Sequence, residues 1–209
     1  MPTIDPGVRI SLTQFLSFAT KPPEQQLTVV RAIKKQHLDG YQVPPDCYKQ
    51  FREAVVHMHK NGLGKGYLDQ VASSQTEATR VKHYPELADG YKKFMGRKSL
   101  EWFEPQKGVW SCQELLVNVR PEIALVVNGQ PRLIKLWLND DQSLNKRRSE
   151  LITHMMRLAI PSLQDDCQPA VLDVRSARLF EIGKSDADQS ALLSAQAMSF
   201  VHMYRVISV

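Results

Sequence analysis

Residues 115–138 read LLVNVRPEIALVVNGQPRLIKLWL, two runs of strand-forming residues on either side of a turn signal. The run 123–127 is rich in β-branched and aliphatic residues, which favour strands. Asn128-Gly129 follows, the dipeptide preferred in a type I′ turn because both central residues take positive φ. Residues 133–138 then return as a second apolar run. The pattern predicts a β-hairpin, with another strand over 115–119.

The residues after the hairpin predict a helix, two strands and a final helix. Apolar residues recur at helical spacing over 143–159, and Pro161 ends that run. Strands are expected at 170–174 and 177–182 because both are short apolar runs around Arg175-Ser176. The last helix is expected at 186–205.

The residues before the hairpin predict short helices divided by proline and glycine. Ser11 is the expected N-cap of the first helix, and Asp46 that of the third. The expected helices cover 11–20, about 24–38, 46–60, 67–71 and 85–95. The fold class is therefore α/β, or α+β, with a helical region at 1–105 and an α/β core at 106–209.

Composition and charge exclude several classes of protein. The chain has 209 residues, 43% of them hydrophobic, which is typical of a folded globular protein. Its formal net charge is +5, and the basic excess lies in residues 1–110, which favours a polyanionic partner for that part. Three widely spaced cysteines form no zinc motif. We expect a cytoplasmic protein without a signal peptide or membrane span.

A carboxylate and an ammonium group are expected to converge on the hairpin. Pro121-Glu122 precedes one strand, and Lys135 lies within the returning strand. One interpretation is a cross-strand ion pair on a sheet. The other is a working or relic catalytic site.

The segment from Pro121-Glu122 to Lys135 resembles the core motif of the PD-(D/E)XK nuclease superfamily. Glu122 matches the acid of its PD pair and Lys135 its final lysine. The resemblance implies a restriction-endonuclease-like core over about 110–209. It also implies Mg²⁺-dependent phosphodiester hydrolysis, with Glu122 as metal ligand and Lys135 orienting the water or the phosphate. Mg²⁺ prefers oxygen ligands, which is why such a site needs carboxylates.

The sequence departs from the family motif at Leu133, where the family has a second acid. Leucine cannot coordinate Mg²⁺. Related nucleases also take acids from the following helix or from the element before the PD strand. The resemblance thus makes Glu150 a candidate catalytic residue and metal ligand, and Glu114 a candidate metal ligand. For both residues the favoured explanation is a surface charge, on a solvated helical face for Glu150 and at a strand edge for Glu114.

Basic residues at two places in the first half could bind phosphate groups. They are Lys34, Lys35, Lys92, Lys93, Arg97 and Lys98. Solvated helix faces explain them as well. The sequence therefore leaves two hypotheses: a nuclease-like protein that binds or cleaves nucleic acid, or a catalytically inactive member of the superfamily that binds a protein or nucleic-acid partner.

Overall fold

The hairpin forms at the centre of the larger sheet, as the sequence predicts. In the computed structural model, β5 (Ile123–Val127) and β6 (Gln130–Trp137) are antiparallel, with Val127 opposite Gln130 and Ile123 opposite Ile134. Asn128 and Gly129 have φ of 50° and 82°, the positive values that a type I′ turn requires. The turn residues thus fix the register of the two strands.

The structure describes residues 7–39, 46–140, 144–160, 167–181 and 187–209. These residues form a mixed α/β fold with seven helices and two mixed sheets, of three and five strands. No helix in these ranges has the length and apolar character needed to cross a bilayer.

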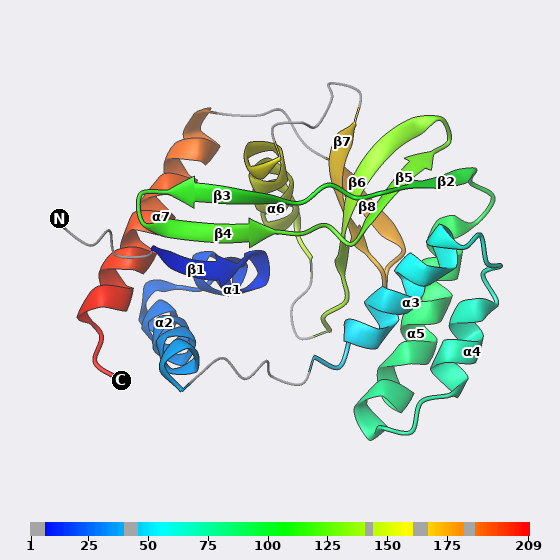
Figure 1. The fold of residues 1–209 in the computed structure, drawn as a ribbon, viewed down its shortest axis with the longest axis horizontal. Coiled ribbons are helices and arrows are strands. Elements are labelled where there is room, and N and C mark those ends of the chain that lie inside the picture. The colour runs from blue at the N-terminus through cyan, green and yellow to red at the C-terminus, as the bar shows by residue number, and fades with distance from the viewer. Residues whose placement is uncertain (1–6, 40–45, 141–143, 161–166, 182–186) are drawn as a thin grey trace.

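The five-stranded sheet has the order β2-β5-β6-β7-β8 (Figure 1). The strands β2 (Leu100–Phe103) and β8 (Arg178–Glu181) are its edges, and β7 (Gln168–Asp173) runs parallel to β6. The helix α6 (Lys146–Ala159) lies between β6 and β7 in the chain. A crossover of this kind is what a parallel pair of strands requires.

The three-stranded sheet was not predicted as a separate sheet. Its order is β1-β4-β3, in which β1 (Val8–Ser11) is parallel to β4 (Leu115–Val119) and β3 (Gly108–Cys112) is antiparallel to it. Residues 1–105 therefore contribute a strand to each sheet, β1 and β2, in addition to helices.

The predicted helices form, and three of them begin three or more residues from the predicted start: α3 at Lys49, α5 at Ala78 and α6 at Lys146. Besides α6, the helices are α1 (Leu12–Ala19), α2 (Pro23–Leu38), α3 (Lys49–Lys60), α4 (Tyr67–Ser73), α5 (Ala78–Met95) and α7 (Ala187–Val206). Ser11 caps α1 in a capping box with Gln14, as its position suggested. Asp46 does not cap α3, because that helix begins at Lys49; its carboxylate accepts from the N–H of Tyr48 in the preceding turn.

The helix α5 begins seven residues before Pro85, the residue expected to start it. Pro85 lies inside the helix, where it lacks one backbone donor. The neighbouring side chains of Tyr84, Leu87 and Ala88 are buried in the core. Their burial holds the helix together across the proline.

Two apolar cores lie on the two faces of the five-stranded sheet. One face packs against α3, α4 and α5 through residues such as Phe51, Tyr84 and Leu87. The other packs against α6, with α1, α7 and the smaller sheet beyond it, as Figure 1 shows. The ends of β5 and β6 thus lie between two groups of helices.

Candidate functional site

The predicted acid–lysine pair forms at the end of the β5–β6 hairpin away from its turn. The register that sets Ile123 opposite Ile134 places Glu122 opposite Lys135. Lys135 Nζ makes an ion pair with Glu122 Oε1, and Glu122 Oε2 accepts a hydrogen bond of 2.8 Å from the backbone N–H of Leu136. The side chains of Lys135 and Glu122 are only 16% and 11% exposed, so water screens the pair less than it would on an open surface.

The helix α3 brings a second ion pair to the same place. Arg52 Nε lies 3.9 Å from Glu122 Oε1. The other side of the guanidinium binds the carboxylate of Asp46. Arg52 therefore stands between two carboxylates that are 76 positions apart in the sequence.

The charges around Asp46 lower the pKa of its carboxyl group. Partial burial acts to raise its pKa, but the hydrogen bond and charge of Arg52, the N–H of Tyr48 and the charge of Lys135 outweigh burial, so the pKa falls below its ordinary value. Asp46 is thus ionised at neutral pH.

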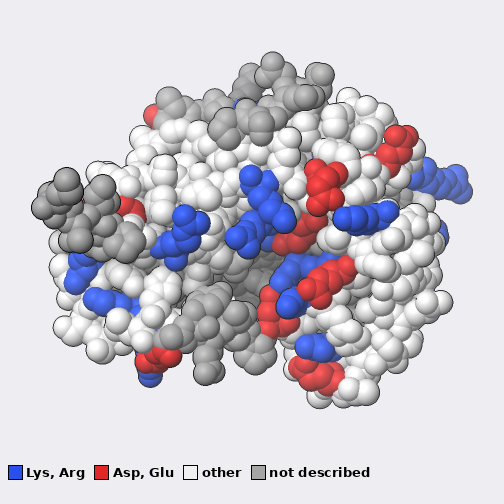
Figure 2. All heavy atoms as spheres, viewed as in Figure 1, with Lys and Arg blue, Asp and Glu red and all other residues white. Residues whose placement is uncertain are grey.

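A cavity of about 350 Å³ opens beside these charges. Asp46, Arg52, Glu122 and Lys135 all line it, together with Arg120, which is exposed and makes no ion pair within the described part of the chain. Three cations thus face two carboxylates. Figure 2 shows a hollow in the middle of this face, with Lys or Arg and Asp or Glu side chains gathered around it.

A second cavity, of about 370 Å³, lies next to the first, and both are lined by Trp137 and Asn139. Arg175 lines the second cavity; its guanidinium pairs with Glu86 and lies 3.1 Å from His83 Nδ1. The hydroxyl of Tyr48, which lines the first cavity, accepts a hydrogen bond from Arg175 and donates one to Asp140. The two cavities therefore share aromatic and polar walls near the end of β6.

The other predicted acids lie elsewhere. Glu114 pairs with Arg205 of α7, and Glu150 lies 3.8 Å from Lys146 on α6, lining a different cavity. Leu133 is 1% exposed and belongs to the apolar core on the α6 side of the sheet. The structure brings together Glu122 and Lys135, and separates them from Glu114 and Glu150.

The predicted metal ligands therefore do not fit one Mg²⁺ ion. Glu122, Glu150 and Glu114 pair with three different cations. No group of three or more histidine, cysteine, aspartate or glutamate residues is close enough to hold a metal among the residues that the structure describes. Asp46 and Glu122 are the two carboxylates of the cavity that Lys135 lines, and Arg52 already pairs with both.

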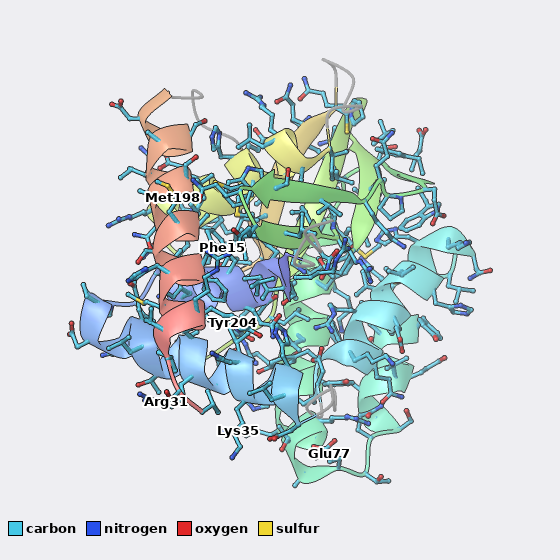
Figure 3. All side chains as sticks on the ribbon, turned by 60° about the vertical axis from the view of Figure 1, so that its left-hand side comes forward. Phe15, Arg31, Lys35, Glu77, Met198 and Tyr204 are labelled. Carbon is cyan, nitrogen blue, oxygen red and sulfur yellow. The ribbon has the colours of Figure 1, made fainter. Side chains whose placement is uncertain are left out.

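The six basic residues proposed to bind phosphate do not form one patch. In Figure 1, α2 and the C-terminal end of α5 lie at opposite sides of the molecule. Lys34 donates to the carbonyls of Tyr204 and Ile207, Lys92 pairs with two aspartates, and Lys98 donates to the carbonyl of Phe94. Lys35 points outward from α2 in Figure 3, and Lys93 and Arg97 are exposed.

Three residues that line the first cavity were not predicted as site residues from the sequence. Asp46 was interpreted only as a helix cap, and Arg52 and Arg120 were not singled out. Arg120 stands directly before Pro121-Glu122, so its place beside the motif was a usable signal. Nothing local in the sequence connects Asp46 or Arg52 to the hairpin, because the packing of α3 brings them there.

The sequence matches no protein-family model and no curated protein to which it was compared. Function is therefore inferred from the cavity itself and from the motif that lines it.

Proposed function

We propose that the protein is a nucleic-acid-binding member of the PD-(D/E)XK superfamily that holds a phosphodiester group in the cavity around Lys135. The observation that carries this proposal is the meeting of Arg52, Arg120 and Lys135 beside the Glu122 motif. Their charge exceeds that of Asp46 and Glu122 by one. A partly buried cationic cavity attracts an anion more strongly than dispersed surface charges do.

The order of elements supports the restriction-endonuclease-like core. The motif lies on an antiparallel hairpin, β5–β6; the helix α6 follows, and then come the strand pair β7–β8 and the last helix α7. This is the order that the motif resemblance implies. The fit concerns topology alone, and the binding proposal depends on the cavity charges.

Arg120 is the side chain best suited to contact a phosphate. It is exposed at the cavity, whereas Arg52 and Lys135 each hold a carboxylate. A guanidinium offers paired N–H donors that match phosphate oxygens. Tyr48 and Trp137 add aromatic surface to the cavity walls, and bases stack on such surfaces in single-stranded nucleic acids.

Binding without cleavage fits the acids of the site better than hydrolysis does. The position of the second acid is Leu133, which lies in the core. The carboxylate of Glu122 is already engaged by Lys135, Arg52 and the N–H of Leu136. An incoming metal would have to displace these partners.

Metal-dependent hydrolysis is the second candidate, and one observation favours it. Asp46 and Glu122 line the same cavity as Lys135. Two carboxylates together with substrate phosphate oxygens are a common way to hold Mg²⁺. When bound, the ion would stabilise charge on the phosphate oxygens. In this candidate Asp46 takes the role that Leu133 cannot.

Fluorescence anisotropy with labelled single-stranded DNA, duplex DNA and RNA tests the proposal at several salt concentrations. Arg120→Ala should weaken binding and lower the slope of log K against log salt by about 1, as for one lost phosphate contact. Arg31→Ala is the matched control, because Arg31 is an exposed arginine on the outer side of α2 (Figure 3). Wild-type affinity in Arg120→Ala, or no binding to any of the three, would overturn the proposal.

Cleavage assays on the same substrates separate the two candidates. Mg²⁺-dependent cleavage that is lost in Asp46→Asn would favour hydrolysis. Salt-sensitive binding without cleavage would favour the inactive, binding form.

A further inference from the structure

The last helix, α7, carries apolar residues on its outer side as well as on its inner side. Its inner side packs in the core through Leu193, Ala197 and Phe200. Between Asp188 and Arg205 the sequence contains no aspartate, glutamate, lysine or arginine. A surface helix normally has charged residues on its outer side, whereas a helix that is apolar all round is a buried one. The composition of α7 is therefore that of a helix covered on both sides.

The outer side of α7 is nevertheless open to solvent in the single chain. Positions three and four residues apart lie on one face of a helix, and the outward row between and beside Asp188 and Arg205 is exposed along its length. The other members of this row are Ala191, Leu192, Ala195, Met198, His202 and Val206. We call the row the α7 face.

Large hydrophobic side chains that are exposed concentrate around the α7 face. Ten such side chains occur in the described part of the chain, and the three most exposed are Leu38 at 65%, Val206 at 62% and Leu192 at 60%. Leu38 belongs to α2, which lies beside α7 in Figure 3 and binds it through Lys34. Six of the ten lie on these two helices or just after α7: Leu27, Leu38, Leu192, Met198, Val206 and Val209. A contiguous apolar patch of this kind marks an interaction surface.

We propose that the α7 face binds a second copy of the chain, with the two α7 helices antiparallel across a twofold axis. The charges select this occupant. Twofold symmetry presents the same surface on both copies, so Asp188 of each copy comes beside Arg205 of the other, and Ala195 comes beside Met198. A parallel pairing would instead bring like charges together. Opposite charges at the two ends of an otherwise uncharged strip fix its register.

The intrachain partner of Arg205 does not prevent this contact. Arg205 pairs with Glu114 of its own chain, and both side chains are about half exposed. A guanidinium has five N–H donors, enough for two carboxylates, and Arg52 already stands between two in the charged cavity.

The dimensions of the α7 face predict a dimer that dissociates on dilution. Asp188 and Arg205 are about 26 Å apart along the helix at 1.5 Å per residue. One helix pair of this length, widened by Leu27 and Leu38, is at the small end of specific interfaces, which bury about 1,200 Å² or more in total. The inference does not depend on the phosphodiester proposal, because no residue of α7 lines the charged cavity.

A lipid surface fits the α7 face less well than a second copy does. Helices that lie on membranes carry several lysines and arginines along the polar border of their apolar side. Arg205 is the single lysine or arginine of α7.

Sedimentation equilibrium tests the dimer from about 1 µM to about 200 µM, where a dissociation constant as weak as ~1 mM still leaves a measurable dimer. The average mass should rise from one chain to two. Ala195→Glu should weaken association at least tenfold, because it brings like charges together near the twofold axis. Val81→Glu is the matched control and should associate like the wild type. Val81 is an exposed apolar residue of α5, a helix on the opposite side of the molecule from α7 (Figure 1).

Charge exchange tests the antiparallel arrangement. Asp188→Arg and Arg205→Asp should each weaken the dimer, and the double variant should recover most of the loss because it restores opposite charges at both ends. Asp188→Arg keeps the test valid if Arg205→Asp, which also loses the pair with Glu114, does not fold.

Three results would overturn the proposal: a monomer at every concentration, a dimer that Ala195→Glu leaves unchanged, or a double charge variant that associates no better than the single ones. A monomer that sediments with vesicles of phosphatidylglycerol and phosphatidylcholine would assign the α7 face to a membrane surface instead.

Discussion

Glu122, the residue directly before β5, lies opposite Lys135 of β6, and the Asn128-Gly129 turn sets this register. Glu122 stands six residues before Asn128, and Lys135 stands six residues after Gly129. A two-residue turn pairs positions at equal distance from it, so both side chains project from the same face of the sheet. The motif therefore converges because of the turn, and the ion pair follows from the register.

Lys135→Met should destabilise the protein by about 1–3 kcal/mol, because it leaves the carboxylate of Glu122 largely buried with one cation fewer. The double variant Glu122→Gln/Lys135→Met should recover part of this loss, since it removes the uncompensated charge. Urea unfolding of the wild type, the two single variants and the double variant gives the coupling energy.

The exposed pair Lys146–Glu150 is the matched control. The side chain of Lys146 is 88% exposed and lies 3.8 Å from Glu150. Lys146→Met should change the free energy of unfolding by less than about 0.5 kcal/mol. Equal effects of the two methionine variants would show that burial adds nothing to the Glu122–Lys135 pair.

Leu133→Glu should unfold or strongly destabilise the protein instead of creating a metal site. Leu133 is 1% exposed among apolar side chains, and a carboxylate there would lose its hydration without a cation to pair with. We expect a loss of several kcal/mol by thermal or urea unfolding. Leu133→Met, which conserves volume, should cost less than about 1.5 kcal/mol.

A different result would contradict the proposal that the protein binds nucleic acid without cleaving it. If Leu133→Glu folds with the stability of the wild type and gains Mg²⁺-dependent cleavage, the position faces the site and not the core.

The sequence predicts the parts of this fold that local patterns control. The turn at Asn128-Gly129, the capping residue Ser11 and the apolar periodicity of the helices act over a few residues each. The short strands β1, β2 and β3 were missed because four or five residues carry little periodicity. The predicted start of α5, at Pro85, was wrong because core packing outweighs the preference of proline for the first turn of a helix.

The residues of the charged cavity also divide into those that a local pattern predicts and those that it does not. Glu122 and Lys135 were predictable, since one turn connects them. Arg52 and Asp46 were not, because they come from the segment containing α3 and meet the hairpin only through tertiary packing. A pattern in one sequence carries no information on which helix covers which end of a sheet.

Gly90→Ala should destabilise the protein, although alanine is normally better than glycine inside a helix by about 1 kcal/mol. Gly90 lies in α5, and a Cβ there would be 2.0 Å from the carbonyl oxygen of Val174. Relieving this overlap requires α5 to move away from the end of β7, at a cost of about 1–3 kcal/mol or more. Thermal unfolding measures the change. Gly64→Ala is the control, because nothing lies within 4 Å of its added Cβ; a Gly90→Ala variant more stable than the wild type would contradict the close helix–strand contact.

Acidification should destabilise the protein through His59. Burial lowers the pKa of His59 from 6.5 to about 4, and its Nε2 bonds to the hydroxyl of the buried Tyr91 at 2.7 Å. Between about pH 6.5 and pH 4 the unfolded chain binds a proton at this position that the folded chain does not. Stability is therefore full above pH 6.5 and is lost as the pH falls through this window, by about 1–2 kcal/mol at pH 5 from this residue.

His59→Gln separates this effect from other titrations, because glutamine can still bond to Tyr91 but does not titrate. Burial also lowers the pKa of His37 and of His154, so the variant should flatten the dependence of unfolding free energy on pH without abolishing it. His57→Gln is the control, since His57 is exposed on the same helix and should leave the slope unchanged. If the slope between pH 7 and pH 5 is the same in His59→Gln and the wild type, the imidazole of His59 is not the buried neutral group that its bond to Tyr91 indicates.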